Sequence, residues 1–154
     1  MIPPPEAPPH LEMPPVVHFL WHAGGAILAT GHCGRDVLEL QEHPGAELAE
    51  IDPELATRLT DMRAWWWDGE APRPRELCPI IPNAGVFVAD GRDELVLTGI
   101  PKGAVLRVTG AVSAGPVTVD DGELRLTTSR PGRLLVSLAP PPPWAPWQEA
   151  FDAE

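Results

Sequence analysis

The sequence predicts a mainly β protein, in which an N-terminal β-hairpin region with one short helix is followed by an immunoglobulin-like β-sandwich. Three observations favour this fold class. The 154 residues include 21 prolines, about three times the usual share, and proline excludes long helices and the interiors of central strands. A glycine turn separates two apolar runs near the start of the chain. From residue 77 onward, short alternating segments recur between turn sequences.

Residues 1–15, MIPPPEAPPHLEMPP, are rich in proline and poor in side chains that nucleate a core. We expect them to form an extended, polyproline-like arm. Such an arm is either a solvated tail or a segment laid along another subunit, because a stiff chain loses little conformational entropy on docking.

Residues 16–75 are predicted to form a small attachment region. VVHFLWHAGGAILATG has apolar runs on both sides of HAGG, which is typical of a β-hairpin with a glycine turn. DVLELQ and, more weakly, GAELAEI alternate apolar with charged residues. In DPELATRLTDM, Asp52 is suited to cap a helix, Pro53 to its first position, and Leu55 and Leu59 to one face, so one short helix is expected there.

Three consecutive tryptophans occupy the middle of MRAWWWDGEAPRPR, residues 62–75. In a strand, Trp65 and Trp67 lie on one face and Trp66 on the other, and Asp68-Gly69 is a strong hairpin signal. Both faces of the hairpin then carry indole. These side chains either belong to the core of this domain or contact a partner, since tryptophan is enriched at interface hot spots.

Residues 76–154 are predicted to form the sandwich. The prolines of the EAPRPR exit cannot donate ladder hydrogen bonds, which indicates an edge strand or linker and a domain boundary near residue 75. The expected strands are LCPII, GVFVA, ELVLTGI, AVLRVTG, PVTVD, ELRLTT and RLLVSLA, separated by glycine- and aspartate-rich turns. Strands of this number and spacing are typical of an immunoglobulin-like sandwich.

The C-terminal segment, LAPPPPWAPWQEAFDAE, has four consecutive prolines followed by aromatic residues. Those aromatic side chains either close the end of the sandwich or meet a partner. Together with the three-tryptophan run, they give the residues that we expect at a partner interface: Trp65, Trp66, Trp67, Trp144, Trp147 and Phe151.

The composition bears on partners and compartment. Eleven Lys and Arg stand against 22 Asp and Glu, and the formal net charge of -11 repels nucleic-acid phosphates and anionic lipid surfaces. No window has the apolar length of a membrane span, and the N-terminus lacks the features of a signal peptide. We expect the protein to stay in the cytoplasm of the producing cell until it joins something larger. Cys33 and Cys78 are interpreted as small buried hydrophobic residues.

Groups that could carry chemistry are few. Side chains near the first hairpin match no zinc spacing: His22, His32, Cys33 and His43. The carboxylates of ADGRDE and of Asp120, Asp121 and Glu123 fall in tight turns, where aspartates bond their own backbone. The serines have no histidine in the second half of the chain to act as a base. We therefore expect no catalytic, metal or cofactor site, and no enzymatic activity.

Several of these segments, taken in order, carry a resemblance. The glycine-turn hairpin, W-W-W-D-G, the proline-rich exit, residues 97–110 (LTGIPKGAVLRVTG) and residues 121–138 (DGELRLTTSRPGRLLVSL) together resemble small accessory tail proteins of tailed bacteriophages. The resemblance covers roughly residues 16–150. It implies a virion component made in the host cytoplasm, attached near the tail tip, fibre or baseplate, homo-oligomeric within the assembly and without catalytic residues.

Two other functions remain open. Tryptophan faces stack on sugar rings and acidic side chains bond hydroxyls, so the chain could be a carbohydrate-binding module that recognises a glycan of the host surface. The acidic charge is also compatible with a tail or tail-fibre assembly chaperone that is absent from the finished particle.

Overall fold

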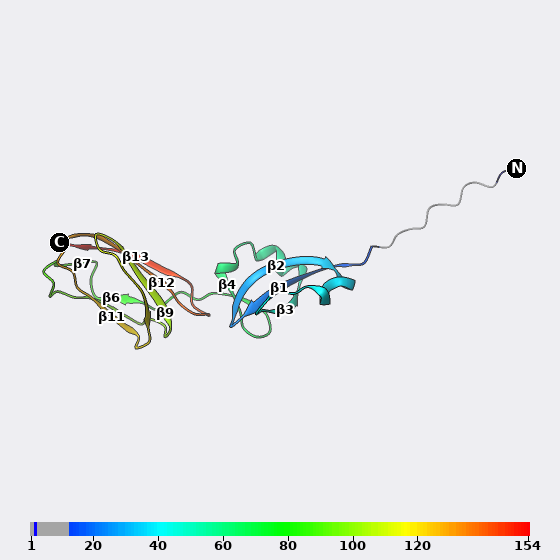
Figure 1. Ribbon diagram of the computed structural model, residues 1–154, viewed down its shortest axis with the longest axis horizontal. Helices are drawn as coiled ribbons and strands as arrows, with labels where there is room; N and C mark the ends of the chain where they lie inside the picture. The colour runs from blue at the N-terminus through cyan, green and yellow to red at the C-terminus, as the bar shows by residue number, and fades with distance from the viewer. Residues whose placement is uncertain (1, 3–12) are drawn as a thin grey trace. The chain divides into compact units, whose positions relative to one another are not determined.

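The structure is a computed structural model that describes residue 2 and residues 13–154. The described chain is mainly β with one short α-helix, which confirms the predicted fold class (Figure 1). It divides into two compact units, Met1–Met62 and Arg63–Glu154. Most of the predicted proline-rich arm, residue 1 and residues 3–12, lies outside the described residues.

The first unit is built on three adjacent antiparallel strands. Strands β1 (Val16–Ala23) and β2 (Ala26–Gly34) make the predicted hairpin, and β3 (Glu47–Ile51) pairs with the other edge of β1. The turn residues Gly24 and Gly25 have φ values of 56° and 84°. Both values are left-handed, as a two-residue type I′ turn requires, and only glycine adopts them without strain.

Helical segments flank β3. Helix α1 (Pro53–Arg58) begins as predicted, with the Asp52 carboxylate accepting from the Glu54 N–H at 2.8 Å and proline in the first turn. Residues 36–41, whose apolar and charged side chains alternate, do not form a strand. They lie largely in the 3₁₀ helix η1 (Arg35–Leu40), because a pattern over so few residues does not separate extended from helical backbone. A second 3₁₀ turn, η2 (Met62–Ala64), spans the point where the two units divide.

The second unit contains a β-sandwich preceded by a small hairpin of β4 (Trp65–Trp67) and β5 (Pro72–Pro74). One sheet has the order β10-β9-β12-β13-β7 and the other β11-β8-β6. Their bounds are β6 (Ile81–Pro82), β7 (Val86–Phe87), β8 (Leu95–Thr98), β9 (Ala104–Gly110), β10 (Ala114–Val119), β11 (Glu123–Leu126), β12 (Gly132–Ala139) and β13 (Trp147–Ala153). Apart from the parallel pair of β13 and β7, both sheets are antiparallel, and two unequal sheets in this order are typical of an immunoglobulin-like sandwich.

Alternating side chains from both sheets build the sandwich core. Leu95 and Leu97 of β8 are fully buried, as are Val136 of β12 and Phe151 of β13. The predicted inward-facing leucines of β11 pack against this cluster, while Arg125 between them is exposed. The half-buried pattern expected for this region is therefore confirmed.

Strand lengths differ from expectation at the start and the end of the sandwich. Only Ile81 of LCPII and Val86–Phe87 of GVFVA are strand. Pro79 has no N–H to donate to a ladder, which fits the short strand at LCPII. The C-terminal aromatic segment, expected as a plug or a partner contact, is instead strand β13, which pairs along its whole length with β12.

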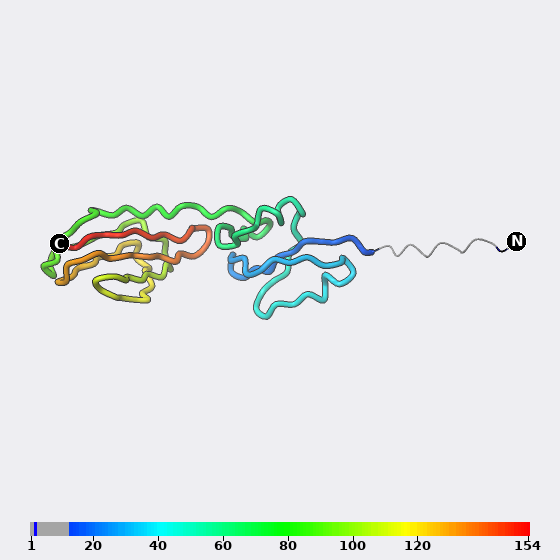
Figure 2. Tube along the Cα trace, turned by 90° about the horizontal axis from the view of Figure 1, so that it is seen from above, coloured from blue at the N-terminus to red at the C-terminus, as the bar shows by residue number. Residues whose placement is uncertain are grey.

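The chain from residue 76 to residue 89 runs alongside the C-terminal segment (Figure 2). Glu76 N–H donates to Pro143 and Ala145 N–H donates to Glu76 at one end, and Ala89 N–H donates to Glu154 at the other. We expected a domain boundary near residue 75, but the compact units divide after Met62. These hydrogen bonds tie the residues that follow position 75 to the C-terminal segment of the sandwich.

Candidate functional site

The three tryptophans are shared between the two faces of the β4–β5 hairpin. Trp65 pairs with Pro74, Trp66 with Arg73 and Trp67 with Pro72. Directly paired residues share a face, so Trp65 and Trp67 lie on the proline side and Trp66 on the arginine side. All three indoles are half-buried. The predicted alternation is therefore confirmed, and none of the three rings is fully exposed.

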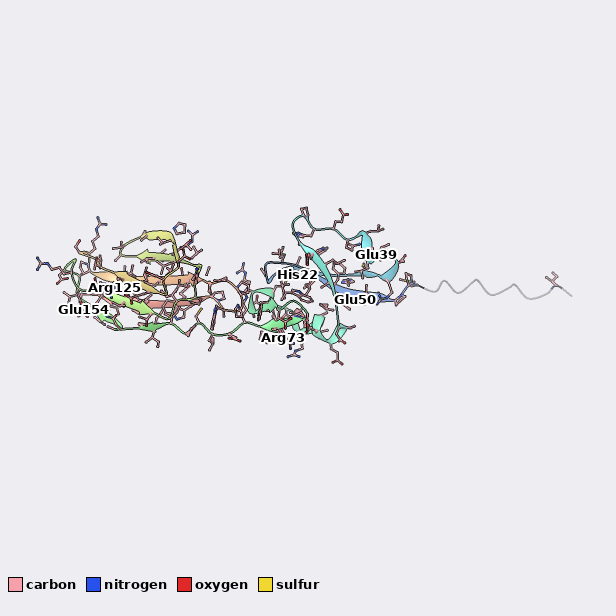
Figure 3. The ribbon with its side chains drawn as sticks, turned by 90° about the horizontal axis from the view of Figure 1, so that it is seen from below. His22, Glu39, Glu50, Arg73, Arg125 and Glu154 are labelled. Atoms are coloured by element: carbon pink, nitrogen blue, oxygen red, sulfur yellow. The ribbon has the colours of Figure 1, made fainter. Side chains whose placement is uncertain are left out.

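The turn of this hairpin is organised by Asp68. Its carboxylate accepts hydrogen bonds from the N–H groups of Glu70 and Ala71, each at 2.8 Å, and from Arg73 Nε at 2.7 Å (Arg73 is labelled in Figure 3). The Arg73 hydrogen bond and then the two backbone N–H groups lower the pKa of Asp68 to about 2. The turn is thus fixed by a carboxylate that stays ionised at all but very low pH.

Arg75 links the tryptophan hairpin to the C-terminal segment. Its Nε donates to the Trp65 carbonyl at 3.1 Å and its Nη1 to the Trp144 carbonyl at 2.9 Å. Next to this link, Cys78 Sγ donates to the Ala145 carbonyl at 3.2 Å, and burial raises the pKa of its thiol. Cys33 and Cys78 are both free and half-buried, which makes them less buried than expected.

The C-terminal aromatic residues have different environments. Trp144 is half-buried and lies in a short parallel bridge with Glu76. Trp147 packs on the edge of the core, with its ring centroid 6.4 Å from that of Phe151. Phe151 is 1% exposed and is one of the largest fully buried side chains. Phe151 is therefore a core residue rather than the partner contact that we expected, because β13 places it opposite Leu134.

A row of exposed apolar side chains was missed by sequence reasoning. Leu77, Ile81, Val86 and Val88 are between 50% and 88% exposed. They lie in residues 77–89, which contain no charged side chain. Strand β6 is at an edge of one sheet and β7 at an edge of the other, so this apolar strip follows the open side of the sandwich. The signal in the sequence was the uncharged run, LCPIIPNAGVFVA, which we interpreted only as strands.

The first unit carries an open groove of about 440 Å³ beside β1 and β3. Trp21 forms one wall, with its ring edge-on to Phe19 at a centroid distance of 4.8 Å and tilted against His43 at 5.5 Å. Leu48, which pairs with Trp21, and residues of the loop 41–46 complete the lining. The Trp21 Nε1 atom is buried and has no hydrogen-bond partner within the described part of the chain. We call this feature the Trp21 groove.

A second, smaller groove of about 300 Å³ lies on the larger sheet of the sandwich, at β9, β12 and β13. Its lining is mostly apolar and includes Trp147, with Arg107, Ser137 and Gln148 as polar neighbours. Ser137 pairs directly with both Arg107 and Gln148, so these three side chains form one row across the outer face of the sheet.

The acidic turns behave as expected. Asp90 accepts from the N–H groups of Arg92 and Asp93, and these bonds lower the pKa of its carboxyl. Asp121 accepts from the Glu123 N–H.

Within the described residues, no group of three or more His, Cys, Asp or Glu side chains is placed to hold a metal ion. Over the same residues, no helix is long and apolar enough to cross a membrane.

Comparison with known proteins gave no match to a protein-family model, to a curated protein or to a solved structure.

Proposed function

We propose that this protein is a non-enzymatic structural component of a phage particle, which docks onto tail, fibre or baseplate proteins. The observation that carries the docking role is the apolar strip of residues 77–89. Four large apolar side chains are exposed there on the edges of two sheets, in a chain whose net charge is -11. Contiguous exposed apolar surface is typical of interaction sites, and the centres of protein interfaces are depleted of charge.

The same unit also carries partly exposed aromatic residues. Trp65, Trp66, Trp67, Trp144 and Trp147 are each half-buried, so each retains surface for a partner. Arg75 ties the backbone of the hairpin at Trp65 to that of the C-terminal segment at Trp144. A rigid aromatic surface binds with a small loss of side-chain entropy. The resemblance in the sequence to accessory tail proteins is the reason that we propose this assembly.

Crosslinking mass spectrometry of purified particles from the source tests this function. We expect the chain to be present in stoichiometric amounts, with crosslinks from near the strip, for example from Lys102 or an engineered lysine at Asn83, to a tail protein. Absence from purified particles rejects the structural role. If the chain is absent from particles but associates with tail-protein precursors in lysed cells, it is an assembly chaperone instead.

The second groove supports carbohydrate binding as an alternative function. One tryptophan ring next to Arg107, Ser137 and Gln148 is a combination that can stack on a sugar ring and bond its hydroxyls. Glycan-array binding of the wild-type chain, lost in Gln148→Ala and retained in the outward-facing Arg133→Ala, favours this alternative. No binding by the wild-type chain excludes it for the glycans on the array.

A further inference from the structure

The Trp21 groove is an aromatic site that the proposed function does not use. Trp21, His43 and Leu48 supply apolar surface, Pro44 adds a flat ring, and Glu42 is the only charged side chain in the lining. A volume of about 440 Å³ is within the range of sites that hold small ligands or a few peptide residues. With no cation in its lining, the groove does not attract an anionic ligand.

The unpaired indole nitrogen indicates which chemistry would complete the site. Trp21 Nε1 is a donor only, and it has no acceptor within the described residues. An unpaired buried donor is unfavourable, so an occupant that opens the groove and brings a carbonyl oxygen to the indole gains a hydrogen bond. Polyproline segments offer such carbonyls, have no proline N–H of their own to satisfy, and dock in aromatic-lined grooves elsewhere.

This chain contains a matching segment. Residues 1–12, MIPPPEAPPHLE, lie outside the described residues except for Ile2, and directly precede Met13, from which the chain enters β1 at Val16. Residues 1–5 of this segment carry no charged side chain. Twelve residues in a polyproline conformation span about 37 Å, which is more than the groove needs.

The position of the arm favours binding between copies. Trp21 lies five residues further along β1 than Val16, about 17 Å from the point where the arm joins the sheet. To reach the groove of its own chain, the arm would have to reverse direction around Pro14 and Pro15, whose φ angles are fixed near -65°. A second copy presents the same groove without that reversal.

We propose that the proline-rich segment of residues 1–12 binds in the Trp21 groove of a second copy of this chain. The contact joins two different surfaces, so it is heterologous and can build a ring or a longer row of copies. This inference goes beyond the proposed function and does not depend on it. A protein that fails to join phage particles could still self-associate in this way, and a protein that joins phage particles could do so without self-association.

The first test uses a synthetic peptide of residues 1–12 and a full-length chain in which the five prolines of that segment are replaced by serine. The indole N–H resonances of the six tryptophans are recorded by NMR, and Trp21→Phe assigns one of them. We expect a saturable shift of the Trp21 resonance, at least ten-fold weaker with a peptide whose prolines are serine. No shift, an equal shift with the serine peptide, or a shift confined to other indoles overturns the proposal.

The second test measures association of full-length chains by sedimentation velocity. The wild-type chain should associate as its concentration rises, and the five-serine variant and a groove-filling Ala46→Phe variant should remain monomeric. Leu28→Ser is the matched control, because Leu28 is exposed on β2 outside the groove lining, and it should associate like the wild type. A monomeric wild-type chain whose Trp21 resonance differs from that of the five-serine variant shows binding within one copy, which overturns the assignment to a second copy.

Discussion

The guanidinium of Arg75 donates to the main-chain carbonyl of Trp144, a residue 69 positions further along the chain, at 2.9 Å. The same guanidinium donates to the Trp65 carbonyl, so one side chain joins the tryptophan hairpin to the C-terminal segment of the sandwich. Carbonyl groups have little sequence preference. Every residue has a main-chain carbonyl, so Arg75 is the one residue whose side chain this link requires. Arginine is suited to the link because its planar guanidinium holds several N–H donors in fixed directions.

Replacing Arg75 should weaken the second unit. We expect Arg75→Ala to lower the free energy of unfolding by about 1.5–3 kcal/mol, as for a lost hydrogen bond that involves a charged group. Arg75→Lys should recover only part of the loss, because a single ammonium does not reproduce the two-direction geometry. Urea unfolding followed by tryptophan fluorescence measures both, with the exposed Arg133→Ala as the control. Equal stability of Arg75→Ala and the wild type would contradict this role.

Asp68 should make stability depend on acid pH. Its pKa is about 2 in the folded chain against an ordinary value of 3.8, so the unfolded chain takes up the proton first as pH falls. The stability that the ionised carboxylate contributes is fully present above about pH 4 and is lost as the pH falls toward 2. Urea unfolding at pH 5 and pH 2.5 should give a larger difference for the wild type than for Asp68→Asn. The same pH dependence in both chains would show that the titrating group lies elsewhere.

The core position of Phe151 gives a third prediction. Phe151→Ala should destabilise the second unit by about 3–5 kcal/mol, because it removes a large ring from a closed cluster and leaves a cavity. Gln148→Ala, an exposed change on the same strand, is the control and should be nearly neutral. Thermal unfolding by circular dichroism distinguishes them. A neutral Phe151→Ala would mean that this ring makes its contacts with a partner, as we first expected from the sequence.

The glycine turn of the first unit is also testable. Gly25 has a φ of 84°, so Gly25→Ala should cost about 1–2 kcal/mol in backbone strain. Gly85→Ala is the matched control, because Gly85 has neither a left-handed φ nor a close neighbour. Urea unfolding of the two variants should therefore differ. If both are neutral, the turn tolerates a side chain and is not what sets the register of the hairpin.

Local patterns predicted most of the strands but not their long-range pairing. The hairpin of β1 and β2, the start of α1 and the inward-facing leucines of β11 all follow from periodicity and turn chemistry within a few residues. Strand β13 was missed because Glu149 interrupts its apolar alternation and four prolines precede it. The boundary near residue 75 was inferred from Pro72 and Pro74, which do mark the short strand β5.

The candidate site was less predictable than the fold. The sequence identified the tryptophans, but whether an indole is exposed depends on what packs over it, and Phe151 proved to be core while its neighbours are half-buried. The apolar strip and the Trp21 groove each require residues that are exposed by the packing of other elements. The sequence of an uncharged run such as residues 77–89 does not indicate whether its side chains face the core or the solvent.

Strand β13 lies between β12 and β7, although it is formed by residues 147–153. A growing polypeptide that has not yet released these residues from the ribosome has a gap in the middle of its larger sheet, and it lacks Phe151. Such a chain exposes Leu134 and Phe87 to chaperones and proteases. Premature termination anywhere before Trp147 should therefore yield a product that the cell's quality control removes rather than a shortened working subunit.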